Sequence, residues 1–166
     1  NEFPARIAEV ALWLVDHQMN QRLSEAFGQY FVRLPLKKSA TIRNANALRI
    51  DWKEVLPPER CSYVMGNPPF VGKKEQSAEQ KGDHGLVWKG TQNAATLDYV
   101  TCWHRLVAEY IRGTNVSVAF VSTNSICQGE QVSILWNFLL RNCQIKLHFA
   151  HRTFAWVSEA RGKAHV

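Results

Sequence analysis

Apolar and polar positions follow two different periods along the chain, and their order predicts an α/β fold. Three stretches show apolar residues at helical spacing, which predicts amphipathic helices over 3–19, 97–111 and 132–140. Three short apolar, β-prone runs predict buried strands over 62–65, 116–121 and 145–150. Strands and helices that alternate in this way indicate an α/β domain with a mainly parallel sheet.

Other stretches carry weaker signals. An apolar run over 31–36 precedes 41–50, where apolar and polar side chains alternate, so we expect a short strand that leads into a loop. Residues 71–96 are mostly polar and rich in lysine and glycine, which predicts a mobile or loosely helical excursion. Residues 162–166 resemble the opening of a further strand. The chain shows no internal repeat and no linker between domains.

Composition is that of one globular domain and excludes a disordered or low-complexity chain. The 166 residues are 46% hydrophobic and 20% charged. A formal net charge of +6 suits a domain with one basic face toward a polyanion. The sequence contains no apolar run long enough for a membrane span and no secretory signal pattern, so we expect a cytoplasmic protein with no membrane partner.

The cysteines and histidines do not predict a metal site. No two of the four cysteines stand at Cys-x-x-Cys spacing, so we expect buried, reduced thiols. His148 and His151 are three residues apart, but no acid or cysteine stands near them at ligand spacing.

The residues after the strand predicted at 62–65 carry the clearest chemistry. In open α/β sheets, ligands bind beyond the carboxyl ends of the strands, and Asn67-Pro68-Pro69-Phe70 lies there. Two successive prolines fix the backbone and remove two donors, which leaves carbonyl acceptors beside the Asn67 amide. Phe70 offers a face on which a planar ring can stack. This tetrapeptide, called the elbow below, therefore predicts a pocket for an exocyclic amine on a flat heterocycle.

The elbow resembles the signature of the amino-group DNA methyltransferases that use S-adenosylmethionine. Three later blocks are similar to those of a bacterial subgroup of large adenine methyltransferases, many of them fused to a restriction nuclease: 97–100, 121–131 and 149–154. The resemblance implies a partial Rossmann-like class I methyltransferase sheet. It also implies methylation of the N6 amine of adenine in double-stranded DNA.

The resemblance assigns roles to residues of the elbow and of the last block. Asn67 and the carbonyl of Pro68, stiffened by Pro69, would accept hydrogen bonds from the target amine during direct in-line methyl transfer. Phe70 would stack on the flipped base, and Phe154 would press its other face. Ordinary packing is the alternative for Phe154, and Trp156 would take its role if the register is shifted. Basic side chains beside this pocket are candidates for phosphate contact, although a solvated face is the commoner reading of such charges: Lys73, Lys74 and Arg152.

A second set of residues resembles parts of the cofactor site. Asn46 and Ala47 are similar to the block that contacts the adenine of S-adenosylmethionine, although relatives usually have Asp at position 46. Asp98 and Tyr99 open the helix predicted at 97–111, whose start touches the cofactor in the family. Asp51, also near a predicted strand end, fits a turn or cap as well as a ligand contact.

The first strand of the family fold and its glycine-rich loop have no counterpart in this sequence. We therefore expect 1–166 to be a fragment of one methyltransferase catalytic domain, inactive when isolated. Its parent polypeptide would supply the cofactor-binding strand upstream and a target-recognition region downstream.

Two alternatives remain open from the residues alone. The first is an amine methyltransferase that acts on cytosine, RNA or a protein glutamine, since the elbow recognises an amide or aromatic amine. The second is a noncatalytic module in which the Pro-Pro turn and the lysines of 71–96 dock on nucleic acid.

Overall fold

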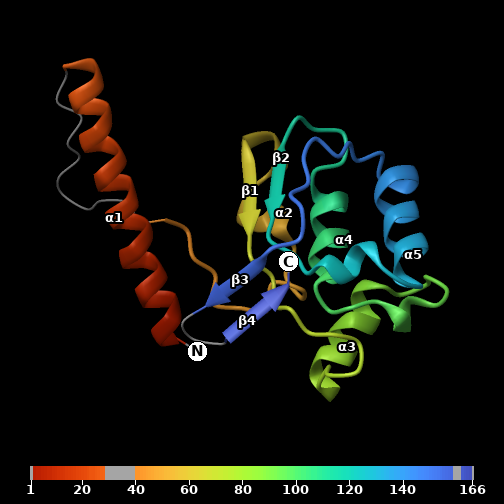
Figure 1. Ribbon diagram of the computed structural model, residues 1–166. Helices are drawn as coiled ribbons and strands as arrows, with labels where there is room; N and C mark the ends of the chain where they lie inside the picture. The colour runs from red at the N-terminus through yellow and green to blue at the C-terminus, as the bar shows by residue number, and fades with distance from the viewer. Residues whose placement is uncertain (1, 29–39, 159–161, 166) are drawn as a thin grey trace. The chain divides into compact units, whose positions relative to one another are not determined.

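The computed structural model describes residues 2–28, 40–158 and 162–165 and divides into two compact units (Figure 1). Unit 1 comprises Asn1–Asn46 and unit 2 comprises Ala47–Val166. The apolar run at 31–36 lies outside the described residues. Among the residues that are described, no helix is both long and apolar enough to cross a membrane.

Unit 1 is built around one long helix, α1 (Glu2–Phe27). It confirms the helix expected over 3–19 and continues beyond it, because ion pairs and hydrogen bonds one turn apart extend along its polar side. Arg6 pairs with Glu2 and with Glu9, each at 3.3 Å. The helix ends before Gly28, whose positive φ of 63° is typical of a residue just past a helix. No residue of α1 is buried.

Unit 2 holds the remaining elements. In chain order they are α2 (Trp52–Val55), η1 (Pro58–Arg60), β1 (Tyr63–Gly66), α3 (Ala78–Val87), η2 (Ala94–Thr96), α4 (Thr101–Tyr110), β2 (Ser117–Phe120), η3 (Asn124–Cys127), α5 (Gln131–Asn137), the π-helical η4 (Phe138–Asn142), β3 (Ala155–Ser158) and β4 (Gly162–His165). The helices expected over 97–111 and 132–140 and the strands expected over 62–65 and 116–121 are confirmed.

Two small sheets occur among the described residues. β1 and β2 run parallel, with Tyr63 opposite Ser117 and Gly66 opposite Phe120 (Figure 1). β3 and β4 form an antiparallel pair, which places a strand where 162–166 predicted one. Mixed helices and strands with a parallel pair are consistent with a partial methyltransferase fold.

Two expected strands are absent from the described part of the chain. Residues 41–50 contain a turn instead, and the indole N–H of Trp52 donates to the carbonyl of Ala47 at 2.8 Å. Residues 145–150 begin by closing η4, since the N–H of Ile145 donates to the carbonyl of Leu139 at 2.9 Å. An alternating or apolar sequence forms a strand only where a neighbouring strand completes its hydrogen bonds.

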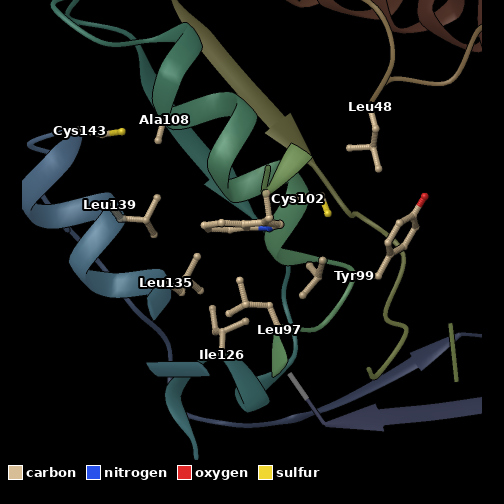
Figure 2. Packing of buried hydrophobic residues seen from close by; sticks show 11 residues of the cluster. Leu48, Leu97, Tyr99, Cys102, Ala108, Ile126, Leu135, Leu139 and Cys143 are labelled. Atoms are coloured by element: carbon tan, nitrogen blue, oxygen red, sulfur yellow. The ribbon is translucent and has the colours of Figure 1, made fainter. Parts of the chain in front are cut away.

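The core of unit 2 lies between α4, α5 and the segment that follows α3 (Figure 2). Leu97, Val100, Cys102 and Leu135 are fully buried, and Trp88 is 2% exposed. The guanidinium of Arg105 lies 5.0 Å from the centre of the Trp88 ring. Helix α4 therefore presents one face to this core, as the periodicity of 97–111 predicts.

The excursion at 71–96 contains more regular structure than its composition indicates. Ser77 and Gln80 form a reciprocal capping box at the start of α3, and Asp83 and His84 on this helix are buried. Trp88 then anchors the segment in the core. Residues 78–87 therefore form a regular, capped helix instead of the loosely helical segment that we expected. The expected mobility of 71–96 stays a prediction.

Candidate functional site

The elbow leaves the carboxyl end of β1 directly after Gly66, where the sequence places it. Asn67 and Pro69 are exposed, Pro68 is buried and Phe70 is half-buried. A residue before proline is restricted to extended backbone, so Asn67 and Pro68 both have little conformational freedom. The buried proline anchors the tetrapeptide, and the Asn67 amide remains open to solvent.

The start of the elbow is fixed against β2. The N–H of Val121 donates to the carbonyl of Gly66 at 3.0 Å, which extends the parallel ladder by one bond. A Cβ atom on Gly66 would lie 3.2 Å from Cε1 of Phe120 and 3.9 Å from Cδ of Pro68. Glycine is therefore the residue that lets the end of β1 pass this close to the Phe120 ring.

The end of the elbow is fixed against the residues that precede α4. The N–H of Tyr99 donates to the carbonyl of Val71 at 3.0 Å. The N–H of Lys73 donates to Oδ1 of Asp98 at 2.9 Å. Both ends of a stiff tetrapeptide are thus held by neighbouring elements, which favours one geometry for the elbow.

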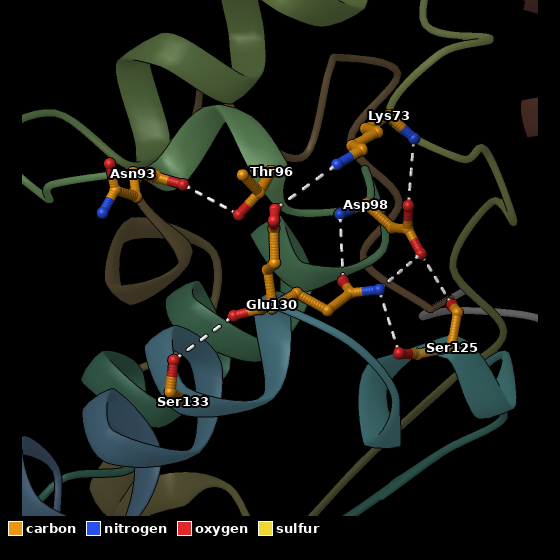
Figure 3. Close-up of polar contacts among 8 residues, drawn as sticks. Lys73, Asn93, Thr96, Asp98, Ser125, Glu130 and Ser133 are labelled. Atoms are coloured by element: carbon orange, nitrogen blue, oxygen red, sulfur yellow. Dashed lines mark hydrogen bonds and ion pairs between the residues drawn. The ribbon is translucent and has the colours of Figure 1, made fainter.

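Asp98 is the centre of a buried polar cluster (Figure 3). Asp98 is 9% exposed, and Oδ2 of its side chain accepts the Ser125 hydroxyl at 2.6 Å and the Gln131 amide at 3.0 Å. Oε1 of Gln131 accepts the backbone N–H of Asp98 at 3.2 Å, and the Gln131 amide also donates to the carbonyl of Ser125 at 2.9 Å. The cluster connects the start of α4 with η3 and α5.

Tyr99 belongs to a second buried cluster. Its hydroxyl donates to Oδ2 of Asp83 at 3.0 Å, and Nε of Arg49 lies 2.6 Å from Oδ1 of the same carboxylate. Burial, followed by the Asp83 carboxylate, raises the pKa of Tyr99, and the hydrogen bond to Asp83 raises the pKa of Arg49. This cluster ties α3 to the residues that follow Ala47.

The candidate cofactor residues Asn46 and Ala47 lie at the boundary between the two units in the sequence. Asn46 is the last residue of unit 1, Ala47 is the first residue of unit 2, and both are half-buried. The carbonyl of Ala47 accepts the indole N–H of Trp52, whose ring packs edge-on against Tyr110 at 5.9 Å. This fixes the backbone of Ala47 within unit 2.

A cavity of about 310 Å³ adjoins the Asp98 cluster. Its lining residues are Lys73, Thr96, Asp98 and 128–131. Nζ of Lys73 lies 3.8 Å from Oε2 of Glu130, an exposed ion pair that contributes little to stability (Figure 3). Lys74 and Arg152 are exposed as well. Most residues that line the cavity are polar or charged, and they include one cation and two carboxylates.

The expected base-contacting aromatic lies in the segment that leads to β3. Phe154 is 41% exposed and packs edge-on against His151, with ring centres 5.2 Å apart. Phe149, 78% exposed, contacts the same imidazole at 6.4 Å. A contact between Phe154 and a base held by Phe70 stays a prediction.

The structure thus brings the elbow together with Lys73, Asp98 and Tyr99. Sequence reasoning missed the partners that hold these residues. Ser125 and Gln131 lie in the block 121–131, which resembles the family, so the sequence marked their positions. It did not show that they bond to Asp98. Asp83 and Arg49 left no local signal, because they meet across a long stretch of sequence.

A parallel strand pair whose first strand ends in an open, doubly fixed Asn-Pro-Pro-Phe elbow is consistent with a methyltransferase domain. The comparisons with known proteins give the family. The model described as the MmeI DNA-methyltransferase domain matches residues 1–166, and the chain belongs to this family.

Two similar proteins extend this result. The chain is 42% identical over 168 residues to DNA methyltransferase A of Bacillus subtilis (strain 168), which covers 99% of the chain and 19% of that protein. It matches a solved structure of the type IIL restriction-modification enzyme MmeI in complex with DNA with a TM-score of 0.86 and 54% identity. That match covers 99% of the chain and 22% of the enzyme, so the chain spans about a fifth of the length of these relatives.

Proposed function

We propose that this chain is the amine-binding part of a longer polypeptide that transfers a methyl group from S-adenosylmethionine to N6 of a flipped adenine in double-stranded DNA. The observation that carries the proposal is the exposed Asn67 amide on an elbow held at both ends. The names of the relatives support it, since one is a DNA methyltransferase and the other a restriction-modification enzyme in complex with DNA. Their greater length supports a parent polypeptide.

The elbow would act by orienting the amine. Oδ1 of Asn67 and the carbonyl of Pro68 each accept one N–H of the adenine amine, which directs the nitrogen lone pair away from the elbow. The lone pair would form the new N–C bond as the S–C bond of the sulfonium breaks and a neutral thioether leaves, and the extra proton would pass from the nitrogen to water beside Asn67. The prolines keep both acceptors in place before the base arrives, so little reorganisation is needed during the reaction.

Aromatic contacts would compensate for removing the base from the duplex. Extrusion costs a few kcal/mol, and stacking on one aromatic side chain offsets about 1–3 kcal/mol. Phe70 is half-buried, so part of its surface remains accessible to a base. Phe154 is exposed enough to contact the other face of the base.

The residues present fit only part of the cofactor. S-adenosylmethionine supplies a methyl group activated by a sulfonium, and the half-buried Asn46 amide can pair with its adenine beside Ala47. The polar atoms of Asp98 and Tyr99 are already engaged within the protein. We assign Asn46 and Ala47 to the adenine on the family resemblance of their block, and we allow Asp98 and Tyr99 only contact through carbon surface, because their polar atoms are engaged.

Affinity for DNA would come from phosphate contacts around the elbow. Lys73, Lys74 and Arg152 are exposed cations on the segments that carry Phe70 and Phe154. Target recognition would belong to a downstream region of the parent, and the parent would work in the cytoplasm. We expect the 166-residue chain alone to be inactive, because the methionine part of the cofactor needs the upstream strand.

The test is methyl transfer by the longer polypeptide that carries this chain. Double-stranded DNA is incubated with methyl-labelled S-adenosylmethionine and digested to nucleosides, and we expect the label in N6-methyl-2′-deoxyadenosine. Asn67→Ala should lower the rate at least ~100-fold, because it removes one fixed acceptor. Asn115→Ala, at an exposed position that lines a cavity at the opposite end of the two strands, is the matched control and should leave the rate unchanged.

Each other product identifies a different function. Label in methylcytosine, or in RNA or protein offered in parallel incubations, would favour one of the other amine substrates. DNA binding without any label in the wild-type polypeptide would favour the noncatalytic module. An active Asn67→Ala variant would refute the role of the elbow.

A further inference from the structure

We propose that Asp98 is a positioning residue that fixes the end of the elbow through its carboxylate, and that this carboxylate does not bind the cofactor. The inference rests on the proposed function, since a fixed elbow matters only if it orients an amine. It changes the role that the family resemblance gives to this position.

The Asp98 carboxylate is nearly saturated by donors from the protein. Oδ1 accepts the Lys73 N–H, and Oδ2 accepts the Ser125 hydroxyl and the Gln131 amide. A carboxylate offers about four acceptor positions, and with three occupied at 9% exposure little of the group remains for a ligand.

The backbone of Asp98 is engaged as well. Its N–H donates to Oε1 of Gln131 at 3.2 Å. Its carbonyl accepts the N–H of Thr101 at 3.0 Å and the hydroxyl of the same residue at 2.7 Å. Asp98 is therefore held in one orientation, which is a requirement for a residue that positions others.

The bonds of Asp98 connect the two chain segments that leave the parallel strands. The Lys73 N–H lies three residues after Phe70 on the path from β1, whereas Ser125 and Gln131 lie on the path from β2. Figure 3 shows the carboxylate between these segments. Since the Val121 N–H already fixes Gly66 at the start of the elbow, the Asp98 carboxylate supplies the matching constraint at its end.

The chemistry of the cluster requires an acceptor with two oxygens. In Asp98→Asn one oxygen becomes an NH2 group, which must face either the Lys73 N–H or the Ser125 and Gln131 donors. A donor that faces a donor cannot form a hydrogen bond, so at least one tie breaks. Displacing an orienting group by about 1 Å can lower a rate ~100-fold without removing any group that touches the substrate.

The experiment compares rate and cofactor affinity in the longer polypeptide. Asp98→Asn should lower the single-turnover rate of methyl transfer ~10- to 100-fold while the Kd for S-adenosylmethionine stays within about 3-fold of wild type. Glu109→Gln makes the same carboxylate-to-amide change at an exposed position near the other end of α4 and should change neither quantity.

Two results would overturn the inference. A loss of cofactor affinity that accounts for the loss of rate would make Asp98 a cofactor ligand, and an unchanged rate would show that its ties do not set the elbow. If Asp98→Asn fails to fold, Ser125→Ala carries the test, because it keeps the Asp98 carboxylate and removes its 2.6 Å donor, together with the 2.7 Å bond between the Ser125 and Thr123 hydroxyls. There a rate lowered ~3- to 10-fold at unchanged cofactor affinity supports the inference, and a wild-type rate overturns it.

Failure of the proposed function is visible separately. It would appear as wild-type polypeptide that places no label on adenine N6. Failure of the inference would appear only in the ratio of the Asp98→Asn rate to a measurable wild-type rate.

Discussion

Gly66 offers a direct test of how closely the elbow is fitted to the sheet. In Gly66→Ala the new methyl carbon would lie 3.2 Å from Cε1 and 3.4 Å from Cδ1 of Phe120. The Phe120 ring packs edge-on against His104, with ring centres 5.5 Å apart, so the imidazole restricts its retreat. Either the ring or the end of β1 must therefore move by a few tenths of an ångström.

The expected magnitude follows from two opposing terms. Overpacking in a fitted site costs about 1–3 kcal/mol. Replacing glycine by alanine restricts the unfolded chain, which returns about 0.4–1 kcal/mol. The net loss of stability is therefore about 1 kcal/mol, but the shift falls next to Pro68, and a small displacement of the elbow should lower the methyl-transfer rate at least ~10-fold.

The matched control is Gly82→Ala in α3, where nothing lies within 4 Å of the added Cβ. Alanine is the better helix former, so this change should stabilise the protein by about 0.5–1 kcal/mol and leave the rate unaltered. The readouts are methyl transfer by the longer polypeptide and hydrogen exchange at the Val121 amide, which bonds to the Gly66 carbonyl. Equal rates and equal exchange in Gly66→Ala and wild type would refute the close fit.

Three further expectations concern the surroundings of the elbow. Asp83→Ala leaves the buried Tyr99 hydroxyl without its acceptor and should lower the free energy of unfolding by about 2–4 kcal/mol in urea titrations. A loss under about 0.5 kcal/mol would contradict this expectation. Burial lowers the pKa of His84 and His104 below 6.5, so the unfolded chain binds more protons just below that pH. Stability should thus fall as pH drops through 6.5, and a flat urea midpoint from about pH 7.5 to 5.5 would contradict this. Lys74→Gln should reduce the slope of log affinity for DNA against log salt by about 0.9, and an unchanged slope would remove Lys74 from the phosphate contacts.

Local sequence patterns were sufficient for the elements that carry the elbow. The apolar run before Gly66 and the two prolines after Asn67 predict a strand that stops abruptly, and β1 does so. Residues 41–50 and 145–150 show patterns of the same kind without forming strands, because pairing depends on a neighbour that a local pattern does not specify. Helix α3 was hidden by Gly82 and by its polar composition, although the Ser77 to Gln80 spacing of its capping box was readable.

The candidate site likewise has a part that the sequence predicts and a part that only the structure shows. The four residues of the elbow are adjacent in sequence, so their shared chemistry could be inferred before the structure was known. The contacts that hold them involve Tyr99, Asp98 and Gln131, which reach the elbow from other elements. Such long-range contacts follow from the packing of α4 and α5 on the core, and no spacing rule encodes them.

An Asn-Pro-Pro-Phe tetrapeptide alone is weak evidence for methyl transfer, because the residues that hold it in place lie elsewhere in the sequence. Prolines stiffen the elbow internally, but a stiff segment on free ends would still rotate as a body and would orient no amine. Gly66 and Val121 fix its start, whereas Asp98 and Tyr99 fix its end, and all four lie outside the tetrapeptide. We expect the same tetrapeptide without an acceptor at the position of Asp98 to orient no amine, so the flanking hydrogen bonds are the feature that would distinguish a site from an ordinary turn.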